Sequence, residues 1–241
     1  MHLERPCPPS KSVGDPLADR LAALPALAGL SRRALEALGR AGTSRAFKRG
    51  EEILAQGERS ERFFVLLSGR VKLCRLLANG RSVTLALLGP GELFGAPAAL
   101  GAQVCEAASV AQEPGTCLEI GREALFATFA QEPKLVGELL PVLTRQLVDC
   151  RNCIVELTCY RVETRFAQLF LKLAERVGER RAEGVFIPIR LSRMDLAEMV
   201  DTTIETAIRV MSRWKSEGVA ETRRGGFLVR DREALEALAF G

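Results

Sequence analysis

Between Thr43 and Ile120 the chain consists of short apolar runs separated by glycine, and this rhythm limits the fold more than any other feature. The separating residues are Gly50, Gly57, Gly69, Gly80, Gly91 and Gly95. Runs such as 63–67, 71–76 and 83–87 have the length and composition of strands. Asn79-Gly80 indicates a hairpin, because both residue types tolerate positive φ. We therefore predict an antiparallel barrel or roll in this part of the chain.

Helical periodicity replaces this pattern of apolar runs and glycines both before and after residues 43–120. Residues 16–42 contain two short amphipathic patterns, and Ser31 is the expected N-cap of the second. After the roll come a short helix at 123–129 and a long helical pattern from Pro133 to about Tyr160. A further helical stretch, from Val162 onward, opens the C-terminal part. Strands in one region and helices around them predict an α+β fold.

Composition argues against several classes of protein. No uninterrupted apolar run approaches the roughly 20 residues that span a bilayer, and the first residues lack the apolar region of a secretory signal. Seven cysteines, an odd number, argue against a disulfide framework and favour a reducing cytoplasm. The only histidine, His2, lies in residues 1–15, which we predict to be a disordered tail. No nucleophile–base pair, phosphate loop or acid pair stands out, so we do not expect an enzyme.

The long helical pattern carries a narrow apolar seam. Its members, spaced alternately by three and four residues, are Val136, Leu139, Leu143, Gln146, Cys150, Cys153, Leu157 and Tyr160. This is the a/d pattern of a coiled coil, and so narrow a seam predicts a parallel homodimer. Three flanking residues, Leu140, Leu147 and Ile154, are expected to pack back on the roll.

Two helices separated by a tight turn follow near the C-terminus. Ser192 and Asp195 have the spacing of a capping box at the start of the first helix. The second begins after Thr203, and its apolar residues at helical spacing are Ala207, Val210, Met211 and Trp214. The opposite face then carries Ile204, Glu205, Ile208, Arg209 and Ser212. A second helix that presents its first turns outward is typical of a helix-turn-helix.

The outward face has the chemistry of base recognition. Arg209 can donate two hydrogen bonds to guanine, Glu205 can accept one from the cytosine amine, and Ile208 can contact a thymine methyl. In the hairpin that follows, Arg223 and Arg224 lie at a Gly-Gly tip and suit phosphate contact. The alternative is a Glu205–Arg209 ion pair within a solvated helix. The capped first helix and the basic hairpin tip favour double-stranded DNA as the partner.

A glycine-punctuated roll, a long helix and a winged helix, in this order, resemble the CRP/FNR family of bacterial transcription regulators. The stretches that carry the resemblance are GRVKL and GPGELFG in the roll, RVETRFAQLFLKLAE directly after the long helix, and LSRMDLAEMVDTTIETAIRVMSRWKSEG in the helix-turn-helix. The resemblance implies a roll like a cyclic-nucleotide-binding domain at 16–132, a dimerisation helix at 133–160 and a winged helix-turn-helix at 161–241. It also implies RNA polymerase as a partner.

The resemblance assigns roles to single residues of the helix-turn-helix. Glu205 and Arg209 match the family's base-reading Glu and Arg, and Thr203 and Thr206 match positions near the DNA backbone. Two aliphatic residues depart from the family's branches. Ile204 stands where the cyclic-AMP receptor branch has an arginine, and Ile208 stands where the oxygen-sensing branch has a serine. We therefore expect a target sequence that differs from those of both branches.

The nucleotide site that the resemblance implies is only partly kept. The family holds the ribose with a Gly-Glu pair and the cyclic phosphate with an Arg-Ser pair further along. Gly91-Glu92 is present, but GAQVCEAASVA contains no arginine and places Cys105 and Glu106 at the phosphate position. A carboxylate there would repel the phosphate. We do not expect cyclic AMP as the effector; the alternative is a cyclic-nucleotide-responsive regulatory module.

Three cysteines near the end of the long helical pattern, Cys150, Cys153 and Cys159, have the spacing C-x2-C-x5-C. A parallel dimer would bring the thiols of Cys150 and Cys153 from both chains together, a ligand set that suits zinc or an iron–sulfur cluster. The alternative is that they pack as small apolar residues. The oxygen-sensing branch of the family uses a similar spacing, but in its N-terminal region. Redox or metal sensing at these cysteines is therefore a hypothesis of its own.

Overall fold

The computed structural model describes residues 16–24, 27–102 and 104–240, so the predicted tail at 1–15 lies outside the described part. The chain separates into two compact units. The first is built from the residues up to Val71, Leu88–Cys105 and Ala111–Leu143, and the second from Lys72–Leu87, Glu106–Val110 and Thr144–Gly241. Among the described helices, none has the length and apolar character to cross a membrane.

The first unit begins with two short helices, α1 (Pro16–Ala22) and α2 (Arg32–Ala41). The Ser31 hydroxyl caps α2 by accepting a hydrogen bond from the Ala34 amide at 3.3 Å, as predicted. A third helix, α3 (Arg122–Gln131), matches the short helix expected at 123–129. These helices pack on the roll through Leu21, Leu38, Leu125 and other aliphatic side chains that are almost completely buried.

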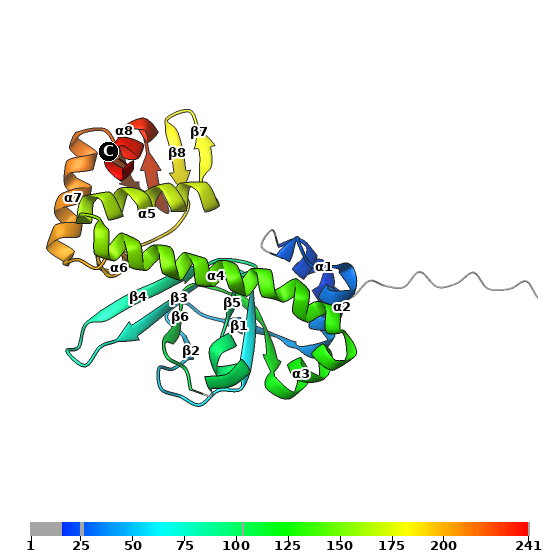
Figure 1. Cartoon of the computed structure of the whole chain (residues 1–241). Coiled ribbons are helices and arrows are strands. Elements are labelled where there is room, and N and C mark those ends of the chain that lie inside the picture. The colour runs from blue at the N-terminus through cyan, green and yellow to red at the C-terminus, as the bar shows by residue number, and fades with distance from the viewer. Residues whose placement is uncertain (1–15, 25–26, 103, 241) are drawn as a thin grey trace, which may run out of the picture. The chain divides into compact units, whose positions relative to one another are not determined.

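The predicted roll is present as one antiparallel sheet (Figure 1). Its strands are β1 (Thr43–Phe47), β2 (Glu52–Leu54), β3 (Arg62–Leu76), β4 (Ser82–Leu88), β5 (Leu93–Phe94) and β6 (Ala108–Gly121). They lie in the order β1-β6-β3-β4, with β2 on β6 and β5 on β3. A single turn of π-helix, Ala98–Ala102, precedes β6.

One strand is longer than expected. The runs 63–67 and 71–76 form the single strand β3, which continues through Gly69 at φ 81°. A Cβ atom at Gly69 would lie 2.6 Å from the Pro114 carbonyl oxygen on β6. Glycine therefore permits the close approach of the two strands instead of ending β3. The hairpin at Asn79-Gly80 is present, and only Gly80 uses a positive φ.

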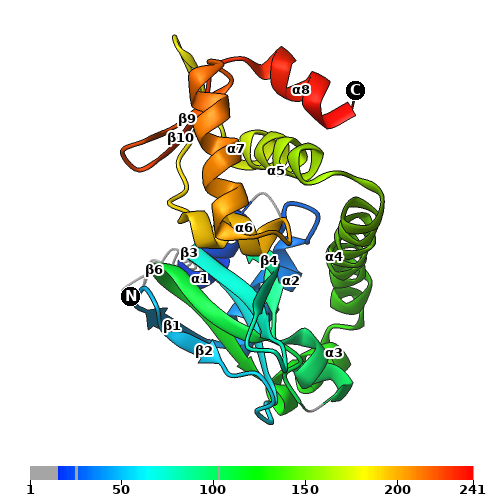
Figure 2. The same ribbon diagram turned by 90° about the vertical axis from the view of Figure 1, so that its left-hand side faces the viewer.

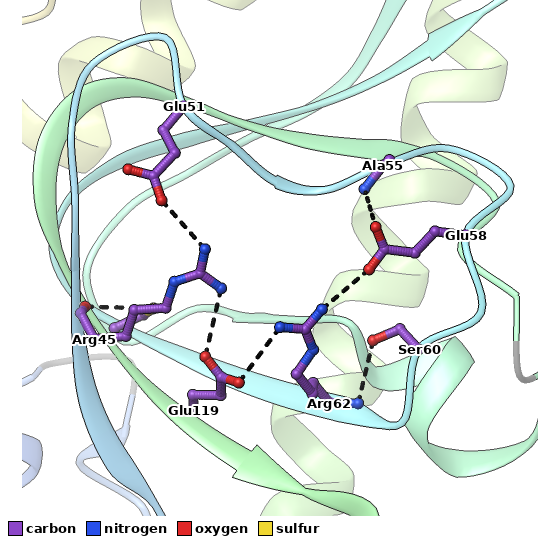
Figure 3. A network of polar contacts seen from close by, with 8 residues as sticks. Arg45, Glu51, Ala55, Glu58, Ser60, Arg62 and Glu119 are labelled. Carbon is purple, nitrogen blue, oxygen red and sulfur yellow. Dashed lines mark hydrogen bonds and ion pairs between the residues drawn. The ribbon is translucent and has the colours of Figure 1, made fainter.

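A network of ion pairs connects three neighbouring strands of the roll (Figure 3). Glu119 on β6 lies between two arginines, Arg45 of β1 at 3.4 Å and Arg62 of β3 at 3.6 Å. Arg45 also pairs with Glu51, and Arg62 with Glu58. The network follows the strand order β1-β6-β3 and so supports the register, although partly exposed pairs contribute little stability.

The second unit contains a small four-stranded antiparallel sheet with helices around it. Its helices are α5 (Val162–Val177), α6 (Arg193–Met199), α7 (Ile204–Ser216) and α8 (Arg232–Phe240). Its strands are β7 (Glu179–Arg181), β8 (Gly184–Ile187), β9 (Ala220–Arg223) and β10 (Gly226–Val229), in the order β7-β8-β10-β9. The fully buried Trp214 of α7 makes edge contacts with Phe166 and Phe170 of α5, at 6.1 and 5.4 Å between ring centroids. This aromatic cluster fixes α7 against α5.

The helix α4 (Pro133–Cys159) forms where it was predicted, but its faces differ from the prediction. Leu139 is buried in the core of its own chain, and Leu143 packs against that core. The three residues expected to pack back on the roll are exposed instead: Leu140 by 54%, Leu147 by 52% and Ile154 by 61%. The face that remains open, which we call the α4 stripe, consists of Val136, Leu140, Leu147, Cys150, Ile154 and Leu157.

Candidate nucleic-acid interface

The first helix of the predicted helix-turn-helix, α6, begins with the expected capping box. The Ser192 hydroxyl accepts a hydrogen bond from the Asp195 amide at 3.0 Å. The Asp195 carboxylate accepts hydrogen bonds from the Ser192 amide at 2.9 Å and hydroxyl at 2.7 Å. Within the same unit, Lys72 pairs with Asp195 at 3.1 Å and with Glu198 at 3.0 Å. Burial opposes ionisation of Asp195, but Ser192 and Lys72 outweigh it and lower the pKa of this carboxyl.

The turn between α6 and α7 is fixed by backbone geometry and by two arginines. Asp201 has φ 49°, in the left-handed region that few residues other than glycine adopt. Its carboxylate pairs with Arg81 at 2.7 Å, and its carbonyl accepts a hydrogen bond from Arg165 at 3.3 Å. Thr203 then caps α7 by accepting a hydrogen bond from the Thr206 amide at 3.3 Å. Thr203 and Thr206 thus lie together at the N-terminus of α7.

The recognition helix α7 has the two predicted faces. Ala207, Val210, Met211 and Trp214 are buried. Glu205, Ile208, Arg209 and Ser212 are exposed, and Ile204 is half-buried. Figure 2 shows α7 directly after α6, with the β9–β10 hairpin next to it. The exposed residues of α7 therefore lie on an open surface that begins at the helix N-terminus.

Glu205 and Arg209 are not engaged with each other. In the residues that the structure describes, no ion pair joins them, although pairs at the same spacing occur elsewhere, as between Arg232 and Glu236. The Glu205 carboxylate instead accepts hydrogen bonds from its own backbone amide and from the Thr203 hydroxyl, and these lower its pKa. The structure thus does not contain the solvated ion pair that was the alternative to base recognition.

The two arginines at the hairpin tip have different surroundings. Arg223 pairs with Glu221 at 2.8 Å and with Glu183 at 3.6 Å. Arg224 is exposed at the tip, next to Gly225 at φ 90°. Of the two, Arg224 is the one whose guanidinium is presented at the tip for a phosphate.

One basic residue of this surface was missed in the sequence. Arg193, at the start of α6, donates a hydrogen bond to the Thr222 hydroxyl of β9 at 2.7 Å. This contact links the helix-turn-helix to the hairpin, and burial lowers the pKa of the Arg193 guanidinium. The two partners are 29 residues apart, so no local sequence pattern predicts this hydrogen bond. The sequence shows only that a basic residue lies in the first turn of α6.

The residues of the implied nucleotide site have structural contacts in the roll. Glu92 accepts a hydrogen bond from the Gly89 amide at 2.7 Å, so it satisfies a backbone donor in the turn before β5. At the phosphate position Cys105 is buried and Glu106 is exposed. Burial and the nearby Glu58 raise the pKa of the Cys105 thiol. A neutral thiol and a carboxylate do not fit a bound cyclic phosphate.

The three cysteines of α4 do not share one face. Cys150 is exposed on the α4 stripe, whereas Cys153 is half-buried and Cys159 is exposed near the helix end. Burial and the adjacent Glu156 raise the pKa of the Cys153 thiol. In the described part of one chain, no three His, Cys, Asp or Glu side chains are grouped as metal ligands. Cys150 lies on the α4 stripe and Cys153 lies half-buried three residues further along α4, and the expectation that both face a partner stays a prediction.

Comparison with known families assigns both parts of the chain. Residues 44–132 match the family described as cyclic nucleotide-binding domain, and residues 164–238 match the Crp-like helix-turn-helix domain. The cyclic AMP receptor protein of Thermus thermophilus is 33% identical over 197 residues, which cover 82% of this chain and 88% of that protein. The nitrogen fixation regulation protein FixK of Azorhizobium caulinodans is 29% identical over 212 residues, covering 86% of this chain and 84% of the relative.

Solved structures show the same architecture. A transcriptional regulator of the CRP/FNR family from Thermus thermophilus has a TM-score of 0.69 at 25% identity, covering 83% of this chain and 99% of that one. FixK2 from Bradyrhizobium japonicum has a TM-score of 0.72 at 21% identity, covering 83% and 98%. The second likeness shows the fold alone.

Proposed function

The chain belongs to the CRP/FNR family of transcription regulators and carries that family's helix-turn-helix DNA-binding domain, and on this premise we propose that two copies bind an inverted-repeat operator. The observation that carries the proposal is the outward face of α7, where Glu205 and Arg209 are exposed and unpaired with each other. Arg209 would bind a guanine through its O6 and N7 atoms, and Glu205 would accept from the N4 amine of a cytosine. Arg224 would contact the phosphate backbone beside the groove.

The proposed dimer forms through the α4 stripe. Its members are exposed in the single chain. Successive members are three or four residues apart, as in a coiled-coil core, except for one step of seven residues between Leu140 and Leu147. Burying them against a second copy would remove this apolar surface from water. A parallel pair of α4 helices would set two recognition helices about 34 Å apart, one turn of DNA. We further propose a cytoplasmic location and RNA polymerase as a partner, in line with the relatives' role as transcription regulators.

We propose that the signal is not a cyclic nucleotide. The reasons are the buried Cys105 and the carboxylate of Glu106 at the phosphate position, and the engagement of Glu92 with the Gly89 amide. The rival function is a cyclic-nucleotide-responsive regulator, which the match to the cyclic nucleotide-binding domain favours. Calorimetry with cyclic AMP separates the two: we expect no heat of binding, and a stoichiometric transition would establish the rival.

Two substitutions test how the protein reads DNA. Arg209→Ala should cost about 1–3 kcal/mol and relax the preference for one G·C pair in each half-site. Arg224→Ala should weaken binding to all sequences and reduce the salt dependence, because it removes a phosphate contact. The measurement is a binding selection from random DNA, followed by titrations of the selected operator at several salt concentrations.

Arg223→Ala is the matched control for Arg224→Ala. Its guanidinium is paired with Glu221 and Glu183, so we expect a smaller loss of affinity. An unchanged half-site preference in Arg209→Ala would show that α7 does not read the groove in this orientation. Failure of the wild-type protein to enrich any inverted repeat would refute the proposed function.

A further inference from the structure

On the outward face of α7, Ile208 is the one large aliphatic residue that is exposed, since Ile204 is half-buried. Ile208 is 48% exposed, while the other exposed residues of the helix are polar or charged. A single exposed aliphatic residue is ordinary on a protein surface. Its neighbours make this one informative, because Ile208 lies between Glu205 and Arg209, the two residues proposed to read bases. An apolar group at this place would lose water on insertion into the groove.

A second isoleucine supports this side chain. Ile204 lies one turn earlier at a spacing of four residues, so the two side chains are neighbours along the same side of the helix. Ile204 is half-buried, and its position is therefore partly set by the protein itself. Both residues are β-branched and restricted at χ1 in a helix, so little side-chain freedom remains for DNA binding to remove. The helix thus presents a rigid aliphatic ridge beside two hydrogen-bonding groups.

The major groove offers such a ridge one apolar partner, the C5-methyl group of thymine. We propose that Ile208 is a specificity-determining residue that selects thymine, through this methyl group, beside the base pair read by Arg209. The two residues are consecutive and lie about 1.5 Å apart along the helix axis, so they reach the same or adjacent base pairs. The inference rests on the proposed function and adds a base to the half-site that hydrogen bonding alone would not define.

Deoxyuridine provides the probe, because it differs from thymidine only in lacking the methyl group. In the operator selected by the wild-type protein, each thymidine of the half-site is replaced in turn, in both half-sites at once. At one position the affinity should fall about fourfold for each half-site, the value for one buried methyl group. At the other positions the affinity should stay unchanged.

The protein variants complete the test. Ile208→Ala should bind the thymidine operator more weakly and should no longer distinguish thymidine from deoxyuridine at that position. Ser212→Ala, a change on the same exposed face, should keep the full distinction. If the wild-type protein is indifferent to every replacement, or if Ile208→Ala keeps the distinction, the assignment is wrong. These outcomes are separate from failure of the proposed function, in which no operator would be enriched and the assignment would fall with it.

Discussion

At the scale of single residues, Asp195 makes the stability of the helix-turn-helix depend on pH. Its carboxylate closes the capping box of α6 and pairs with Lys72, and its side chain is 12% exposed. The pKa of the Asp195 carboxyl is lower in the folded state than in the unfolded chain, where it is near 3.8. The ionised carboxylate therefore stabilises the fold fully above the unfolded pKa, and this stabilisation is lost as the pH falls through the folded pKa. Asp195→Asn should therefore lower the free energy of unfolding by about 1–3 kcal/mol at neutral pH. The difference from wild type should shrink in acid.

The fluorescence of Trp214, the only tryptophan, reports unfolding of the second unit in which Asp195 lies. Asp231→Asn is the control, since Asp231 is exposed and caps α8, where asparagine caps equally well. We expect that variant to stay within about 0.5 kcal/mol of wild type at every pH. A loss in Asp195→Asn that does not depend on pH would contradict the ionised capping box.

The sequence predicts the local contacts of some residues but not the tertiary contacts of others. The capping box, the N-cap at Thr203 and the buried face of α7 follow from spacing over a few positions, and the structure contains all three. The pairing of Arg223 with Glu183 and the hydrogen bond of Arg193 to Thr222 depend on tertiary contacts between distant segments. No local pattern encodes such contacts, so the different surroundings of Arg223 and Arg224 could not be foreseen.

At the scale of elements, the position of α4 could be predicted, but its faces could not. The sequence has apolar residues at both Leu139 and Leu140, which project about 100° apart around a helix. A seam of apolar residues at three- and four-residue spacing can be drawn either through Leu139 or through Leu140. Packing in the first unit decides the matter, because Leu135 and Leu139 fill its core and leave Leu140 outside.

The α4 stripe predicts which substitutions abolish the dimer. Leu147→Asp should give monomers that keep their helix content, because it places a charge in the apolar contact between copies but not in the core of one chain. Val148→Asp is the matched control, since Val148 is 45% exposed but lies beside the stripe. Analytical ultracentrifugation should find the control dimeric. A dimeric Leu147→Asp, or a monomeric Val148→Asp, would place the contact on another face of α4.

At the scale of the whole molecule, the dimer would bring identical residues of the α4 stripe together across its axis. Cys150 is then adjacent to its own copy, whereas Cys153 is already half-buried in the single chain, near Glu156, which pairs with Lys172 of α5. Two thiols for each dimer are half of the four ligands of a structural zinc site or a cysteine-bound cluster. The proposed response to oxidation is therefore a disulfide between the two Cys150 side chains, formed as an oxidant such as diamide takes two electrons and two protons from the thiols.

Gel electrophoresis without reductant tests this response. Wild type and Cys153→Ser should both migrate as cross-linked dimers after treatment with diamide, and Cys150→Ser should not. Reduction should return the cross-linked chains to monomers in the denaturing gel, because the bond is a disulfide. The same samples, purified without oxygen, decide between this response and a metal site, since a cluster or zinc ion would be measurable as iron, zinc or acid-labile sulfide. Equal cross-linking in Cys150→Ser, or stoichiometric metal that is lost in Cys153→Ser, would show that Cys153 turns toward the partner and that the proposed dimer contact needs a different rotation of α4.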